Sequence, residues 1–216
     1  MKKIPSIFVR LERSNVVDTD KVTPGCEWVF TSLLTNIFIT VKRDGAPMLY
    51  RHGLWYQRRE LKSRLDPGID GIPKPLDFTP CQPAPSYDDE SKQWEWPGWV
   101  PLDQQNRKLV DEAIISRGGM KDSEDGFTYE LCGPKVVGNP EGWDTHHLFA
   151  HASERIIISA QETSLTLAYL YLLLKSINHQ GIVVYNGQLT DSGMQCAKLK
   201  KRDLGLDWPV KAEAKN

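Results

Sequence analysis

Apolar residues of strand-forming types are frequent in the first quarter of the chain. Glu27–Phe30 opens a β-rich run that continues through Asn36–Val41, and its β-branched and aromatic residues predict a strand leading into Lys42. Gly45–Pro47 interrupts this pattern, because glycine and proline are poorly suited to the interior of a strand. The pattern therefore predicts a strand that places Lys42 next to a break in the regular structure.

A β-hairpin is the clearest local signal after this break. Met48–Arg51 and Leu54–Arg59 are two strand-like segments separated by the dipeptide His52-Gly53. A glycine in a two-residue connection suits the tight turn that joins antiparallel strands. We therefore expect two adjacent strands at this position.

Two helices and four more strands are predicted downstream. Residues 104–117 predict a helix that ends at Gly118-Gly119 and has one apolar side made of Leu109, Val110, Ala113 and Ile114. Residues 164–176 are apolar nearly all round, which predicts a buried helix. The strands are predicted at Phe127–Leu131, Arg155–Ser159, Gly181–Tyr185 and Gln195–Lys200. Runs of strands with few helices between them indicate an α+β fold rather than a doubly wound sheet.

Residues 66–101 predict a long loop with little regular structure, because they are rich in proline and glycine. This segment holds Trp94, Trp96 and Trp99. The three rings either pin the loop to the body of the protein or stack on nucleic-acid bases. We favour the first interpretation.

The overall composition is that of an ordinary globular protein. The 216 residues carry a formal net charge of -1, with 40% hydrophobic and 25% charged residues, and we expect a single domain over 1–216. Any nucleic-acid contact must then use a local basic patch. Two clusters are candidates, although a charge run is more often a solvated face: Arg58, Arg59, Lys62 and Arg64, and then Lys198, Lys200, Lys201 and Arg202.

Cysteine spacing and hydropathy narrow the setting. The four cysteines are far apart and form no CxxC pair, so we expect reduced thiols in a cytoplasmic protein. No apolar run is long enough to span a membrane, and no apolar run follows the first five residues as in a signal peptide.

Lys42 is the strongest candidate for chemistry, as the first residue of Lys42-Arg43-Asp44-Gly45. A lysine attacks phosphorus only as the neutral amine, which burial and cationic neighbours favour. Lys198 and Lys200 are suitable neighbours because residues two apart on a strand share a face. Asp44 stands two residues from Lys42 and is expected to orient it. Taken alone, this four-residue string is more often a charged turn.

The ordered set of motifs resembles the covalent nucleotidyltransferases, which include ATP-dependent ligases and mRNA capping enzymes. The set is Lys42–Gly45, Tyr129–Leu131, Gly181–Val184 and Lys198–Lys200. Within that group the chain is most similar to a family of small ATP-dependent RNA ligases, because it also has the strings Trp96–Pro101 and Lys201–Pro209. The resemblance implies the adenylation-domain fold of ligases, an ATP-grasp-like arrangement of antiparallel sheets flanked by helices. It also implies ATP and Mg²⁺ as cofactors, with Mn²⁺ as a substitute.

The resemblance assigns roles to several residues. Lys42 takes AMP from ATP, passes it to the 5′-phosphate of an RNA end, and a 3′-hydroxyl then displaces it. Lys42, Lys198 and Lys200 are the expected catalytic residues. The residues expected to bind the nucleotide are Lys42, Asp44, Gly45, Glu130, Phe149, Lys198, Lys200, and Arg58 or Arg59. Of these, Glu130 is expected on the ribose, Phe149 against the adenine, and one of the two arginines on the 5′-phosphate side, with the choice between them open.

Gln180 departs from the family pattern. The resemblance implies a glutamate for the catalytic metal immediately before the strand that starts at Gly181, and this chain has glutamine there. Glutamine offers a carbonyl oxygen without charge, so it is a poorer Mg²⁺ ligand. Natural variation and a substitution that traps an intermediate are both compatible with this change.

Three histidines suggest a metal site at first sight. His147 and His151 are four residues apart, next to His146, but no HExxH motif accompanies them and Asp144 is the one nearby acid. We therefore do not expect zinc at this position.

Chain length separates the members of the superfamily. Sixteen residues follow Lys200, so we expect no C-terminal OB-fold such as capping enzymes and most DNA ligases need. The expected partners are RNA ends and ATP, with no membrane, and the expected form is a monomer. Two alternatives remain: a DNA nick ligase of the same superfamily, and a non-catalytic protein that binds RNA ends, which Gln180 favours.

Overall fold

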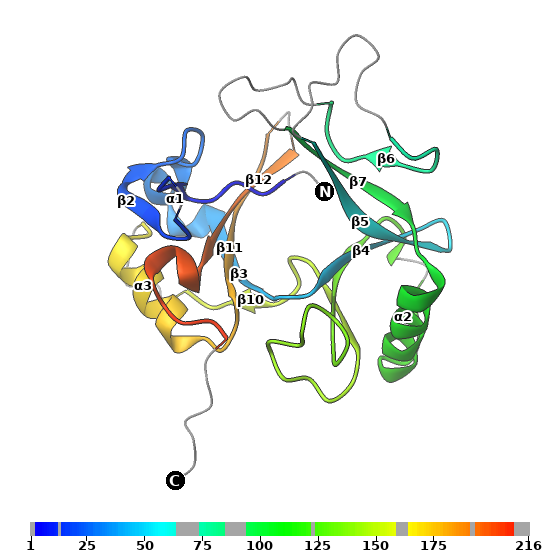
Figure 1. Ribbon diagram of the computed structural model, residues 1–216. Helices are drawn as coiled ribbons and strands as arrows, with labels where there is room; N and C mark the ends of the chain where they lie inside the picture. Colours follow the sequence, from blue (N-terminus) through cyan, green and yellow to red (C-terminus); the bar gives the residue numbers. More distant parts are fainter. Residues whose placement is uncertain are drawn as a thin grey trace. The chain divides into compact units, whose positions relative to one another are not determined.

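The computed structural model describes residues 3–12, 14–63, 74–84, 94–121, 124–158, 164–190 and 193–209. The chain forms two compact units, each mainly of antiparallel strands (Figure 1). The six-stranded unit comprises residues 1–3, 45–137 and 143–151, and the four-stranded unit comprises residues 4–44, 138–142 and 152–216. Within the described ranges the chain is therefore mixed α/β with antiparallel sheets and few helices, as the α+β prediction requires.

The six-stranded unit is one antiparallel sheet with a helix on one face. Its strands, in spatial order, are β6 (Thr79–Pro80), β7 (Trp94–Pro101), β5 (Leu54–Ser63), β4 (Ala46–Arg51), β8 (Thr128–Cys132) and β9 (His147–Ala150). The helix is α2 (Gln104–Ser116), capped by the Asp103 carboxylate, which accepts a hydrogen bond from the Asn106 N–H.

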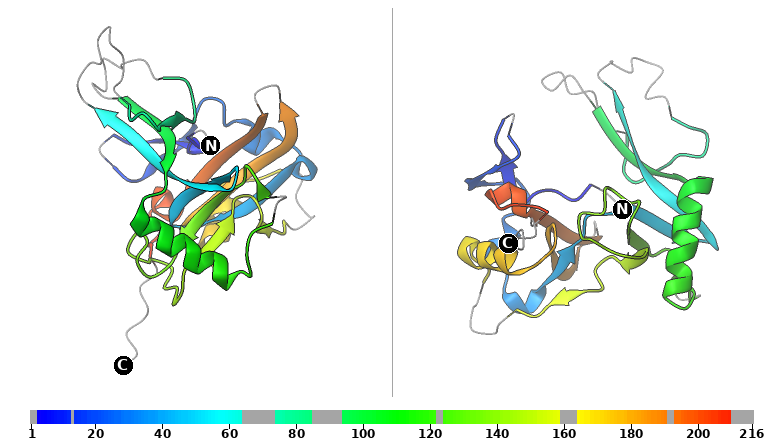
Figure 2. Two further views of the ribbon diagram at one scale, coloured as in Figure 1. Left: turned by 90° about the vertical axis from the view of Figure 1, so that its right-hand side faces the viewer. Right: turned by 60° about the horizontal axis from the view of Figure 1, so that its bottom comes forward.

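Apolar packing decides which face of this sheet is covered. Val110 and Ala113 of α2 are buried together with Met48 and Tyr129, which come from the adjacent strands β4 and β8. Figure 2 shows α2 lying along this sheet. Because side chains alternate between the two faces of a strand, every second residue of β4 and β8 points to the face away from α2.

The four-stranded unit combines a sheet with short helices. The sheet is β10 (Arg155–Ile156), β3 (Ile37–Lys42), β11 (Gly181–Thr190) and β12 (Gly193–Lys200), in that spatial order. The other elements are the strand pair β1 (Phe8–Arg10) and β2 (Val17–Val22), the helices α1 (Trp28–Thr31) and α3 (Leu167–Ser176), and the 3-10 turns η1 (Leu34–Asn36) and η3 (Lys201–Leu204).

Its core lies between the sheet and α3. Leu170 and Leu174 of α3 are fully buried and belong to one cluster with Ile39, Ile182 and Leu199 from three neighbouring strands. The side chains of these strand residues all point to the sheet face that α3 covers. Residues at the alternate positions, which include Lys42 and Lys200, point to the opposite face, away from this core.

The predicted hairpin is confirmed. Arg51 pairs with Leu54 across the turn, and both turn residues have positive φ, 52° for His52 and 74° for Gly53. Two left-handed residues in a row give the type of tight turn whose twist matches the flanking strands.

The prediction of a strand over Glu27–Phe30 is wrong. Trp28–Thr31 forms the single-turn helix α1, and the strand begins later, at Ile37. Burial outweighs propensity at this point, since the helical turn places Val29 in the core at 0% exposure and brings Phe30 to 5.7 Å from Phe8, measured between ring centroids.

The prediction of a loop over 66–101 is wrong at its end, because Trp94–Pro101 is the strand β7. Residues 66–73 and 85–93 lie outside the described residues, as does Arg64. Proline is accommodated at Pro97 because its ring nitrogen is on the β6 side, where the strand pairing ends after Pro80 and the Pro97 carbonyl accepts the Cys81 N–H at 2.9 Å, so no bond to β5 is lost. Trp96 is buried with Phe78 and donates to the Gln82 carbonyl, so its structural interpretation holds.

The remaining element predictions largely hold. The observed α2, β8, β11 and β12 overlap their predicted ranges, and β10 covers Arg155–Ile156, while Ser159 lies outside the described residues. The helix α3 is not buried all round, because Leu172 is 63% exposed and Tyr171 is 39% exposed on the side away from the core. None of the helices in the described ranges is long and apolar enough to cross a membrane.

Candidate active site

A row of three paired residues crosses the four-stranded sheet at its lysines. Gly181 of β11 is directly opposite Lys42 on one side and Lys200 on the other. Directly paired residues project their side chains to the same face. The structure thus brings the two lysines to one face of the sheet, two strand spacings or roughly 10 Å apart at their Cα atoms.

Glycine at the centre of this row is required by space. A Cβ added to Gly181 would lie 2.3 Å from the Leu199 carbonyl oxygen, closer than atoms can approach. Gly181 also contributes no side chain between the two lysines. The row is therefore a surface with an ammonium group on each side and bare backbone in the middle.

Lys200 binds its proton more weakly than an ordinary lysine does. Its pKa is lowered from 10.5 to about 8, first by burial and then by the charges of Lys42, Arg202 and Lys198, with Asp203 opposing the shift. From the sequence, Lys200 is expected to be a cationic neighbour of Lys42, and a lowered pKa of Lys200 itself is not expected. At neutral pH this face holds positive charges whose mutual repulsion a polyanion would relieve.

Lys198 is on the same face, two residues before Lys200. It pairs with Val183 of β11, and the N-terminal segment runs alongside it. The Lys198 N–H donates to the Pro5 carbonyl, and the Ile7 N–H donates to the Lys198 carbonyl, both at 2.9 Å. These bonds hold the lysine-bearing strand in place from its outer side.

A buried ion-pair network fixes the backbone next to Lys42. Arg43 is 9% exposed, and its guanidinium donates to the carboxylates of Glu141 at 2.9 Å and Glu154 at 2.7 Å. The second oxygen of Glu141 accepts the Asp44 N–H at 3.2 Å and lies 3.5 Å from the His179 ring. Nothing in the sequence indicated Glu141, because it is 98 residues from Arg43.

Asp44 and Lys42 have separate partners. The Asp44 carboxylate accepts a hydrogen bond from the Trp208 indole N–H at 3.0 Å, and Lys42 Nζ donates to the Arg43 carbonyl at 3.1 Å. Lys201 lies over the Trp208 ring, 5.6 Å from its centroid, and burial lowers the pKa of Lys201. Trp208, which the sequence analysis named only as part of Lys201–Pro209, thus ties this segment to the Lys42–Gly45 motif.

Gln180 directly precedes the row. It is 8% exposed, its backbone carbonyl accepts the Lys201 N–H, and its side-chain Oε1 has no hydrogen-bond partner among the described residues. A buried, unsatisfied carbonyl oxygen fits a cation or a hydrogen-bond donor on a ligand. No group of three or more His, Cys, Asp or Glu residues in the described ranges is arranged to hold a metal. Gln180 therefore fits a Mg²⁺ held mainly by phosphate and water, as is common for this ion.

The boundary between the two units falls inside the motif Lys42–Gly45, between Asp44 and Gly45. In the six-stranded unit the Gly45 N–H donates to Glu130 Oε1 at 3.1 Å. A Cβ on Gly45 would lie 2.3 Å from the Leu131 carbonyl oxygen. Glycine is needed here so that the backbone can approach β8 closely enough for this bond.

Glu130 is held from its other side by a histidine. His151 Nε2 lies 2.9 Å from Glu130 Oε2, and His151 Nδ1 lies 2.9 Å from the Thr128 hydroxyl. His151 therefore orients the carboxylate, a role the sequence did not suggest. His146 contacts Glu112 through its Nδ1, at 2.7 Å, in a buried position.

The structure distinguishes Arg58 from Arg59. Arg58 is two residues from Tyr56, which pairs with Leu49, and Leu49 pairs with Thr128. This chain of pairs places Arg58 on the same sheet face as Thr128 and Glu130. Its side chain is 10% exposed and lies 3.7 Å from Glu60. Arg58 is therefore the arginine that accompanies Glu130.

Arg59 points its side chain to the opposite face of the sheet from that of Arg58. It is two residues from Gln57, which pairs with Met48 in the core beneath α2. Its side chain is therefore on the helix-covered side of the sheet, and its backbone pairs with Gly98.

Phe149 belongs to an aromatic cluster on the same face as Glu130, with which it pairs. Its ring centroid is 5.2 Å from that of Trp143 and 5.7 Å from that of His147. All three are partly exposed, so the cluster offers ring surface to a planar ligand.

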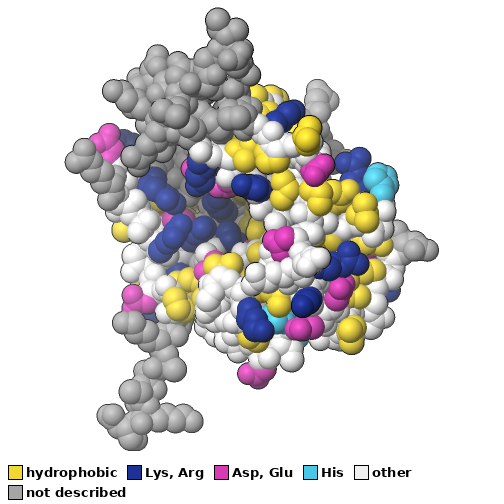
Figure 3. Space-filling view, turned by 45° about the vertical axis from the view of Figure 1, so that its right-hand side comes forward, with side chains coloured by type: hydrophobic (Ala, Val, Ile, Leu, Met, Phe, Trp, Pro, Cys, Tyr) yellow, Lys and Arg dark blue, Asp and Glu magenta, His cyan; other side chains and the backbone are white. Residues whose placement is uncertain are grey.

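Positive charge is distributed in local groups. In Figure 3, Lys and Arg side chains form several separate groups with Asp and Glu near them. The candidate residues divide between the units. Lys42, Asp44, Gln180, Lys198 and Lys200 are in the four-stranded unit, and Gly45, Arg58, Arg59, Glu130 and Phe149 are in the six-stranded unit.

No protein-family model matches this chain, and a search of curated proteins found no match.

Proposed function

We propose that this chain is an ATP-dependent RNA ligase that joins 5′-phosphate and 3′-hydroxyl RNA ends through AMP bound to Lys42. One observation carries the proposal: Lys42 and Lys200 flank Gly181 on one sheet face, in the order of motifs that the ligase resemblance implies. Such a face supplies both a lysine nucleophile and the cations that a triphosphate requires.

The first step of the proposed reaction takes place at the lysine row. Lys42 Nζ attacks the α-phosphorus of ATP, the new N–P bond forms, the bond to pyrophosphate breaks, and the amine releases a proton. Lys198 and Lys200 bind the phosphate oxygens and stabilise the charge on the leaving pyrophosphate. The Arg43–Glu141 pair and Trp208 hold the backbone of the motif while Lys42 reacts.

The second and third steps use the RNA ends. An oxygen of the 5′-phosphate attacks the same phosphorus, the N–P bond breaks, and Lys42 regains a proton. A 3′-hydroxyl then attacks the activated 5′-phosphate, and AMP leaves. By resemblance, Glu130 contacts the nucleotide ribose and Phe149 the adenine, and we assign the 5′-phosphate to Arg58.

A divalent ion completes the proposal. Mg²⁺, or Mn²⁺ in its place, supplies neutralisation of phosphate charge when it is bound, and Gln180 Oε1 is the protein ligand that would hold it. The proposal also includes the ligase adenylation fold for the chain, and a monomer that acts on RNA ends.

The decisive experiment measures the covalent adduct. The chain is incubated with ATP and Mg²⁺, its intact mass is measured, and the modified peptide is mapped. We expect the addition of one AMP on Lys42, lost in Lys42→Arg and retained in the control Lys108→Arg, which changes an exposed lysine of α2. An adduct on Lys200 instead, whose pKa is lowered, would contradict the assignment.

Two further arms separate the alternatives. A panel of 5′-phosphorylated RNA and DNA ends distinguishes an RNA ligase from a DNA nick ligase, and we expect joined RNA. RNA binding without any adduct, even with glutamate restored in Gln180→Glu, would indicate a non-catalytic RNA-end-binding protein.

A further inference from the structure

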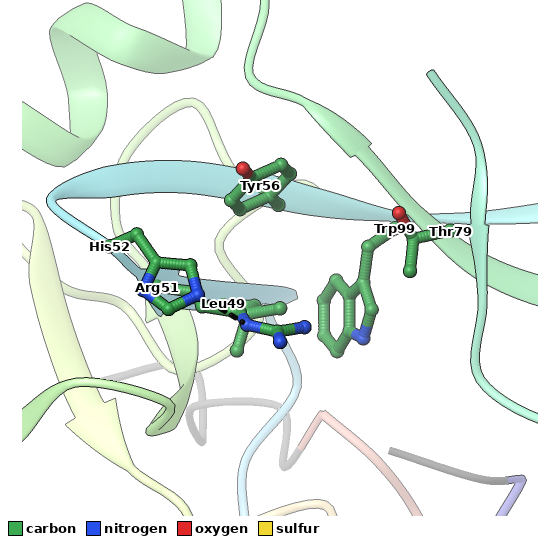
Figure 4. Close-up of a pocket in the computed structure, with 6 residues that line it drawn as sticks. All are labelled: Leu49, Arg51, His52, Tyr56, Thr79 and Trp99. Atoms are coloured by element: carbon green, nitrogen blue, oxygen red, sulfur yellow. Dashed lines mark hydrogen bonds between the residues drawn. The ribbon is translucent and has the colours of Figure 1, made fainter. Parts of the chain in front are cut away.

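A small pocket opens on the six-stranded sheet next to Arg58. Its volume is about 200 Å³, and its lining comes from the four strands β4 to β7: Leu49, Arg51, His52, Tyr56, Thr79 and Trp99. In Figure 4 the Arg51 guanidinium points toward the Trp99 indole, and the Tyr56 ring lies beside them on β5. Tyr56 is partly exposed, whereas Trp99 is buried at 4% exposure and forms a wall.

This pocket is on the same sheet face as Glu130 and Arg58. Tyr56 pairs with Leu49, and Trp99 pairs with both Arg58 and Thr79, so their side chains share one face. Arg58 adjoins the pocket, because it is two residues from Tyr56 on β5 and pairs with Trp99 of β7, and Glu130 lies on β8, the strand on the other side of β4. The three features therefore lie on one face of one sheet, within a single unit.

The rim of the pocket is pre-formed. Arg51 and His52 lie at the hairpin turn, where the His52 N–H donates to the Asp125 carboxylate and Arg51 Nε donates to His52 Nε2 at 3.3 Å. A two-residue turn restricted in this way has little freedom left to lose on binding.

The size and chemistry of the pocket select a class of ligand. Pockets that enclose whole drug-sized ligands measure about 300–1,000 Å³, so this one suits a single planar group rather than a complete ATP. An aromatic ring provides a stacking surface for any base, and an arginine provides a bidentate partner for phosphate.

We propose that this pocket holds the 5′-terminal nucleoside of the phosphorylated RNA strand. Its base lies on Tyr56, and Arg51 binds the phosphate on its 3′ side. This inference rests on the proposed function, because it takes Arg58 as the residue that contacts the 5′-phosphate. It predicts that the chain recognises one nucleotide of the strand beyond the reacting phosphate.

The test uses variants of the full chain and a labelled 5′-phosphorylated single-stranded RNA. Tyr56→Ala should weaken RNA binding by about 5- to 150-fold, the range for loss of one base–aromatic stack, and Tyr56→Phe should retain the binding. Arg51→Gln should lower the slope of log affinity against log salt by about one phosphate contact. The matched controls are Tyr171→Ala, on the exposed side of α3, and Arg59→Gln, on the opposite sheet face.

A change in the RNA makes the same test without altering the protein. RNA lacking only its first base should bind the wild type as weakly as intact RNA binds Tyr56→Ala, and the two changes together should add little. If binding is insensitive to both changes while Lys42 still takes AMP, the pocket assignment is overturned and the ligase proposal stands. A raised requirement for ATP in Tyr56→Ala would overturn it as well, because the pocket would then serve the adenylate. Absence of the Lys42 adduct would overturn the ligase proposal itself.

Discussion

Replacing Lys200 with methionine should stabilise the protein at neutral pH while removing the proposed adenylylation of Lys42. The Lys200 side chain is partly buried on a face that also carries Lys42 and Lys198. Burial and the charges of its neighbours disfavour its protonated form in the folded chain. Methionine retains most of the side-chain volume and removes the charge.

The size of the effect follows from the pKa. A fall from 10.5 to about 8 corresponds to a ceiling of about 3 kcal/mol of destabilisation in the wild type. Lys200 keeps appreciable contact with solvent, so screening reduces this figure, and we expect Lys200→Met to gain about 1 kcal/mol. For a chain of this length, such a gain raises Tm by about 2–4 °C.

The gain must also depend on pH with a definite sign. Between pH 8 and 10.5 the unfolded chain binds more protons at Lys200 than the folded chain does, so wild-type stability rises with pH through this window. Lys200→Met lacks this rise, and its advantage should be full below pH 8 and disappear above pH 10.5. Burial raises the pKa of Tyr185 to about 12, above this pH window, so the titration of Tyr185 does not contribute to the expected difference.

Thermal unfolding followed by circular dichroism, from pH 6.5 to pH 10.5, measures both quantities. Lys108→Met, an exposed substitution on α2, is the control and should change stability by less than about 0.5 kcal/mol. If Lys200→Met is no more stable than the wild type at pH 7, or if its advantage is the same at every pH, repulsion on the lysine face is not the cause. Loss of adenylylation together with gained stability would show the trade-off expected of a site built to bind a polyanion.

Three more perturbations examine the supports of the lysine row. Glu141→Gln leaves the buried Arg43 with one carboxylate fewer and should cost about 2 kcal/mol in chemical denaturation; an unchanged midpoint would contradict a structural role for this pair. Gly181→Ala should destabilise by about 1–3 kcal/mol and abolish adenylylation, because its Cβ meets the Leu199 carbonyl, whereas normal adduct formation would show that the row tolerates a side chain. Gln180→Glu should lower the Mg²⁺ concentration needed for half-maximal ligation, and superimposable Mg²⁺ titrations would show that this position does not serve the metal.

Local signals in the sequence located the hairpin and the long helix well. His52-Gly53 encodes its turn in two residues, because both must take positive φ. Residues 104–116 keep the helical period, with Leu109, Val110 and Ala113 on the buried side, and the stop at Gly118-Gly119 is also local. Such features need no knowledge of the rest of the chain, which is why they could be predicted.

The errors occur where a distant contact outweighs the local signal. Trp28–Thr31 has strand-forming residues, yet burial of Val29 in the core and the contact between Phe30 and Phe8 favour a turn of helix. Proline in 94–101 predicts a loop, yet a strand forms because the missing N–H of Pro97 falls on the side of the strand where the pairing with β6 ends. Neither the core contact nor the end of the pairing between β6 and β7 can be seen in a short window of sequence.

For the candidate site residues, arrangements that follow from spacing along one strand could be predicted, and roles that depend on a tertiary contact could not. Lys198 and Lys200 share a face because they are two apart, a relation visible in the sequence. Glu141, His151 and Trp208 act through partners 21 to 164 residues away. Their roles appear only when the fold brings the partners together.

The choice between Arg58 and Arg59 shows why the alternation of apolar and polar residues reveals the buried face of some strands and not of others. In β12 the fully buried Ala197 and Leu199 alternate with the two lysines, so the sequence itself separates the core face from the polar face. In β5 polar residues run consecutively from Gln57, and nothing in the strand marks which parity is inward. The pairing partners supply the missing information, since the pairing of Gln57 with Met48 fixes Arg59 toward the helix and leaves Arg58 on the face of Glu130. A functional residue can therefore be assigned from sequence where its own strand alternates, and elsewhere it needs the register of its neighbours.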